Sequence, residues 1–107
     1  MPTPDELYMQ SINEQRDYLA KLQDAFNQKC DQIGAQAAEK LKEIPESDEG
    51  ARKTVFDEQK KLLDEALVQL KSEINHSSAA HRKKLEEIHA QRELEVIGRL
   101  ETEMKSL

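Results

Sequence analysis

The stretch that decides the fold is Ile44-Pro45-Glu46-Ser47-Asp48-Glu49-Gly50. Pro45 disfavours helical backbone at Ile44 and has no amide hydrogen to donate. Ser47 or Asp48 can cap a following helix, because their side chains accept hydrogen bonds from the free amides of a first turn. A connection of about three to six residues makes the two flanking helices antiparallel neighbours. The sequence therefore predicts a turn over about residues 45–48 with a helix on each side.

Upstream of the turn, the sequence predicts one helix over about residues 4–44. Thr3 can accept a hydrogen bond from the amide of Glu6, and Pro4 suits the first helical position. An apolar stripe follows in steps that average about 3.6 residues, the period of a straight helix. Its members are Tyr8, Ile12, Leu19, Leu22, Phe26, Cys30, Ile33, Ala37, Leu41 and Ile44, with Gln15 filling the one gap.

Downstream of the turn, a second helix is expected over about residues 49–105. Its apolar stripe has a weak place, because no large apolar residue occurs between Ile74 and Leu85. Asn75 can end a helix, and Ser77 or Ser78 can start another. Because no Gly or Pro forces a break there, we expect one continuous helix. The alternative is a break near residues 75–79 and a three-helix bundle. No internal repeat or low-complexity segment stands out.

The fold expected from these signals is all-α: a long, coiled-coil-like antiparallel hairpin that forms a single domain over residues 1–107. A turn centred near residue 47 pairs residues whose numbers sum to about 94. The start of the first helix then lies opposite residue 90, and residues 91–107 of the second helix extend beyond it. Dimerisation into a four-helix bundle would cover the apolar side chains of this extension. The candidate interaction residues are Leu94, Val96, Ile97, Leu100, Met104 and Leu107.

Several functional classes are disfavoured by composition. Charged residues make up 36% of the chain and aromatic residues 4%, and the three glycines are not clustered. The sequence has no glycine-rich phosphate loop, nucleophile elbow or zinc-protease motif, so we expect no catalytic site and no cofactor. One metal-like spacing occurs, from Glu86 to His89, but His89 lies one position past the stripe. We expect no metal there, and the alternative is a carboxylate–histidine site in a dimeric bundle.

Other polar features predict solvated or structural roles. His76 and His81 lie five residues apart, a poor spacing for sharing one ion on a helix; we expect both to be solvated. Cys30 has no partner for a disulfide within the chain, which favours a reducing, cytoplasmic compartment. The N-terminus has no signal-peptide pattern. Net charge is −6 and no segment is basic on balance, so binding to nucleic acid or to a membrane surface is disfavoured.

The sequence therefore favours a non-enzymatic interaction or scaffold protein that acts through a self-associating helical hairpin. Its expected partners are a second copy of the chain and a further, unidentified protein. An alternative is a small helical chaperone or secretion-associated protein, which would bind a client through the apolar segment from Leu94 to Leu107.

Overall fold

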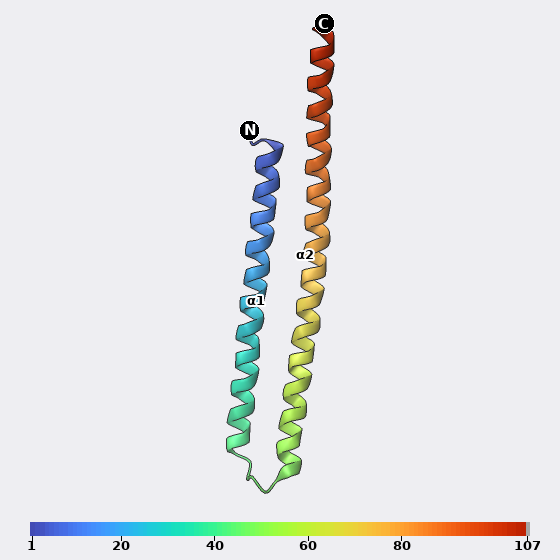
Figure 1. Ribbon diagram of the computed structural model, residues 1–107. Helices are drawn as coiled ribbons and strands as arrows, with labels where there is room; N and C mark the ends of the chain where they lie inside the picture. Colours follow the sequence, from blue (N-terminus) through green and yellow to red (C-terminus); the bar gives the residue numbers. More distant parts are fainter. Residues whose placement is uncertain (107) are drawn as a thin grey trace. The chain divides into compact units, whose positions relative to one another are not determined.

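The computed structural model describes residues 1–106, which form two helices joined by a short turn (Figure 1). The helices are α1 (Pro4–Lys42) and α2 (Glu49–Lys105). No strand occurs among residues 1–106, and the predicted all-α hairpin class is confirmed. Helix α2 is continuous through residues 75–79, so the alternative break and three-helix bundle do not occur.

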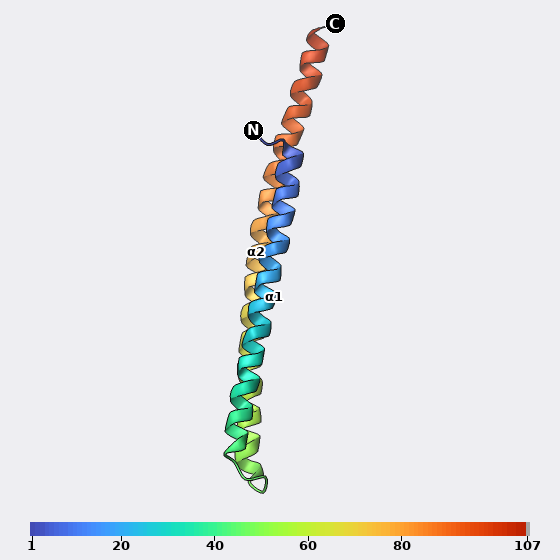
Figure 2. The ribbon, with the colours of Figure 1, turned by 90° about the vertical axis from the view of Figure 1, so that its left-hand side faces the viewer.

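The chain forms two compact units, each built from a segment of α1 and a segment of α2. The turn unit comprises residues Leu19–Ile74, and the terminal unit comprises residues 1–18 together with the chain from Asn75 onward. Within each unit, the two helical segments run antiparallel; they lie next to each other in Figure 1, and α1 lies in front of α2 in Figure 2. The face along which they meet is called the seam below. That both units act as one domain stays a prediction.

Side-chain hydrogen bonds fix the helix ends. The Glu6 amide donates to Thr3 Oγ1 at 3.2 Å, and the Ala51 amide donates to Asp48 Oδ1 at the same distance. Arg52 of α2 donates to two carbonyl oxygens near the end of α1, those of residues 41 and 44. The Leu41 carbonyl also accepts a hydrogen bond from the Ile44 amide, whereas the Ile44 carbonyl lies beyond the last helical residue and cannot be paired within α1. One guanidinium therefore holds the end of α1 to the start of α2.

The inward positions of both helices repeat every eleven residues, in steps of four, four and three. This period corresponds to about 3.67 residues per turn. The sequence pattern suggested only a plain stripe, because small and polar residues occupy several inward positions and interrupt it. In α1 the repeat is 11, 15, 19, then 22, 26, 30, then 33, 37, 41; in α2 it is 55, 59, 63, then 66, 70, 74, then 77, 81, 85 and 88.

The seam of the turn unit is closely packed around small and branched side chains. Its buried residues are Ile33 and Ala37 of α1 and Val55 and Ala66 of α2. An ion pair between Lys40 and Glu58 bridges the helices at the edge of the seam, with a distance of 3.2 Å between nitrogen and oxygen. Because both charged side chains are more than half exposed, apolar burial contributes more to holding this seam together than the ion pair does.

Candidate functional site

The apolar residues near the end of α2 are exposed to solvent. The side chains of this C-terminal apolar face are between 50% and 71% exposed: Leu94, Val96, Ile97, Leu100 and Met104. Leu107, the sixth residue predicted for this surface, lies outside the described residues. These five exposed large apolar residues lie within eleven positions, and they outnumber the four that lie within thirteen positions of α2 in the turn unit, namely Phe56, Leu62, Leu67 and Val68. Such a patch is typical of an interaction surface.

This face does not continue the seam. At about 100° per residue, Ile97, Leu100 and Met104 lie roughly 120° to 180° around α2 from Ile88, the last buried residue of the seam. The inward positions that would follow Ile88 are mostly polar, since they include Arg92 and Arg99. Ile97, Leu100 and Met104 therefore point away from α1, and extending α1 along its present path would not cover them; Val96 lies nearer to α1.

The start of α1 lies beside the near end of this face. Thr3, Pro4 and Asp5 line a shallow recess together with four residues of α2, namely Arg92, Glu95, Val96 and Arg99. Asp5 forms an ion pair with Arg92, which ties the first turn of α1 to α2. The seam therefore reaches slightly beyond residue 90, the end expected from the sequence. Val96 borders the recess, whereas Ile97, Leu100 and Met104 are not among its lining residues.

The seam of the terminal unit has a polar layer that sequence reasoning did not identify. Ser11 is only 2% exposed, and its Oγ lies 3.3 Å from Nδ1 of His81. One turn away, Ser77 Oγ donates to Gln15 Oε1 at 2.9 Å. The gap after Ile74 in the second stripe thus faces the polar positions of the first. The sequence could have revealed this layer, because it has two short polar stretches at matching positions. In each hydrogen-bonded pair the two residue numbers sum to 92, close to the sum of 94 expected for facing residues.

The three histidines are placed separately. His81 belongs to the polar layer and is half-buried rather than solvated, which corrects the expectation for that residue. His76 is exposed, and the ring of His89 lies against Tyr8 with 5.6 Å between ring centres. Among residues 1–106 no three His, Cys, Asp or Glu side chains come together in a way that holds a metal ion. Cys30 occupies an inward, half-buried position of α1.

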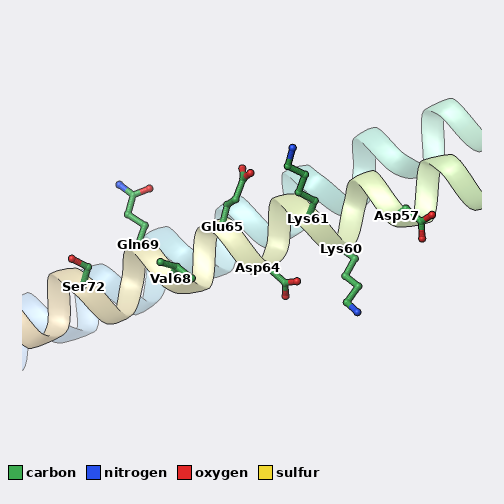
Figure 3. A pocket seen from close by; sticks show the side chains of 8 residues that line it. All are labelled: Asp57, Lys60, Lys61, Asp64, Glu65, Val68, Gln69 and Ser72. Atoms are coloured by element: carbon green, nitrogen blue, oxygen red, sulfur yellow. The ribbon is translucent and has the colours of Figure 1, made fainter.

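The outer surface of α2 in the turn unit carries an open depression (Figure 3). All its lining residues come from α2 alone. Lys61, Glu65 and Gln69 project to one side of the helix, while Lys60 and Asp64 project to the other. Acidic and basic groups alternate along it, and Val68 is its one apolar member. This arrangement is typical of a solvated helix face, and we assign no site to it.

An ion pair between the helices perturbs one carboxylate in the terminal unit. Lys84 Nζ donates to Glu14 at 3.2 Å, and this hydrogen bond and the Lys84 charge lower the pKa of Glu14 below its usual range. A hydrogen bond from Gln10 acts in the same direction. A carboxyl group with a lowered pKa in the folded state stabilises that state above its ordinary pKa. The contribution is lost as the pH falls through the lowered value.

Replacing Glu14 with glutamine is therefore expected to reduce the melting temperature slightly at about pH 7, and not at all at a pH low enough to protonate this carboxylate in the folded state. The effect is small because both side chains are about half exposed. Thermal melts of wild type and Glu14→Gln across this pH range measure it. When Lys84→Met is present in both chains, the difference in melting temperature caused by Glu14→Gln should shrink. An unchanged difference would contradict Lys84 as the cause of the lowered pKa.

Neither described helix contains a stretch long and apolar enough to cross a membrane. Comparisons of the chain with protein-family models, with curated proteins and with solved structures find no match.

Proposed function

We propose that this chain is a non-enzymatic interaction protein, a scaffold that self-associates through its C-terminal apolar face. The observation that carries the proposal is the cluster of five large apolar side chains on α2 that are at least half exposed. Leaving such surface in water is unfavourable, and association with a complementary apolar surface removes it from water.

The spacing on this face favours a helix as the bound element. Ile97, Leu100 and Met104 follow one another in steps of three and four residues. This is the spacing of the interface positions in a heptad coiled coil, where each side chain fits between residues of a facing helix. A second copy of the chain supplies such a helix, so the two chains pair through the C-terminal parts of their α2 helices.

The size of the face predicts a weak dimer. A large apolar side chain contributes on the order of 100 Å² of apolar surface, so five that are roughly half exposed offer about 300 Å² per chain. A stable interface of standard size buries about 800 Å² per partner. We therefore expect dissociation constants in the micromolar range rather than the nanomolar range.

Sedimentation equilibrium of the full chain tests the proposal. Over a loading range of about 1 to 500 μM, the average mass should rise from that of one chain toward that of two. Raising the salt concentration should weaken the association only slightly, because apolar burial rather than charge supplies most of it. A mass of one chain at every concentration would contradict self-association.

We also propose that the protein acts in the cytoplasm. The support is the lone thiol of Cys30, which has no partner for a disulfide within the chain and suits a reducing compartment.

A further inference from the structure

We propose that the second copy docks antiparallel on the C-terminal apolar face, with Ile97 of each copy opposite Leu100 of the other. This orientation rests on the self-association proposed above. The same surface also admits a parallel pair, in which every residue of the face meets its own counterpart. The charges on and beside the face distinguish the two arrangements.

A parallel pair brings like charges together inside the interface. Glu93 precedes Ile97 by four residues, so it lies on the same side of α2 as Ile97, Leu100 and Met104. In a parallel pair, the Glu93 carboxylates of the two copies face each other between the helices. Like charges opposed at an interface oppose association, and this arrangement leaves neither carboxylate with a partner. The position of Glu93 thus disfavours the parallel pair.

An antiparallel pair separates these carboxylates and places a cation near each. When Ile97 faces the partner's Leu100, Glu93 faces the partner's Met104, and the two copies of Glu93 lie at opposite ends of the overlap. Lys105 follows Met104 directly in the sequence, so its flexible side chain ends near the partner's Glu93. The two charge pairs formed in this way are complementary, and they favour the antiparallel arrangement.

The terminal unit leaves this approach open. Ile97, Leu100 and Met104 lie away from the side of α2 that carries Ile88, so a second helix reaches them without displacing α1. In the antiparallel pair, Arg92 lies opposite the partner's Lys105, which carries the same charge. Its guanidinium is already paired with Asp5 of α1, which reduces the repulsion at that end of the overlap.

Disulfide trapping distinguishes the orientations. All variants are full-length chains in which Cys30→Ser removes the natural thiol. A single thiol is then introduced by Met104→Cys, Glu93→Cys or Val68→Cys. Val68 is 68% exposed on α2 of the turn unit and serves as the control for random collisions. The antiparallel pair predicts that an equilibrated mixture of the Met104→Cys and Glu93→Cys chains, mildly oxidised, gives mainly the mixed disulfide, identified by its mass.

In that arrangement the two copies of residue 104 are offset by eleven residues, or about 16 Å along the helices, which is beyond the reach of a disulfide. Each variant alone should therefore cross-link no more than the Val68→Cys control. Efficient self-linking of Met104→Cys would establish a parallel pair and overturn the orientation. A dimer in sedimentation with no linking above the control would also overturn it, because the interface would then lie elsewhere. A monomer in sedimentation overturns the proposed function itself.

Discussion

Replacing Ile33 with aspartate is expected to unfold the turn unit. Ile33 is 7% exposed in the seam, so the change removes about 1.5–3 kcal/mol of apolar burial and places a carboxylate where it has no partner. The combined cost, at least about 4 kcal/mol, is close to the lower end of the stability of folded domains. Far-ultraviolet circular dichroism should lose its cooperative transition, and amides of residues 19–74 should lose protection from hydrogen exchange.

Val68→Asp is the matched control, because it introduces the same carboxylate at an exposed position of the same unit. This control should change the melting temperature by only a few degrees. If Ile33→Asp melts cooperatively at nearly the temperature of wild type, Ile33 does not lie in the seam as described.

Replacing Ile97 and Leu100 together with aspartate is expected to weaken dimerisation more than a hundredfold. Each change removes an apolar side chain from the proposed interface, and each adds a carboxylate that must lose water there. A combined loss of about 3 kcal/mol or more corresponds to that factor. Sedimentation equilibrium measures it, and circular dichroism should show that the helical content is largely retained, since both residues are exposed in the folded chain.

A double replacement at Met9 and Val68 provides the comparison. Both are more than half exposed and lie outside the C-terminal apolar face, so the Met9→Asp, Val68→Asp chain carries the same added charge. It should dimerise nearly as wild type does. Equal weakening in the two double variants would show that net charge, rather than the apolar face, controls association.

The fold followed from local signals that have direct physical causes. The cap at Thr3, the proline at residue 45 and the cap at Asp48 all act within a few residues, so the sequence displays them fully. The predicted end of α1, at about residue 44, was less accurate. The helix stops at Lys42, and the amides of the next two residues donate to the carbonyls three residues before them. Such tightening is common in the last turn of a helix and has no clear signature in sequence.

The polar layer was missed because its meaning depends on two segments about 60 to 70 residues apart. Ser11 considered alone looks like an exposed residue beside the apolar Ile12, and the polar stretch after Ile74 looks like a weak place in α2. Only the register between the helices turns both into partners. The apolar face near the end of α2 was visible in the sequence, but its rotation away from the seam required the positions of the buried residues around α2.

The eleven-residue repeat of the seam has a consequence for how such a hairpin can change length. Removing eleven residues rotates the rest of an ideal helix by only about 20°, so the same side continues to face inward. Matched deletions or insertions of this size in α1 and α2 preserve the contacts on both sides of the change, whereas a change of one or two residues turns inward side chains toward solvent. Hairpins built in this way can gain or lose length in whole repeats, while the turn and the apolar face near the end of α2 keep their own sequences.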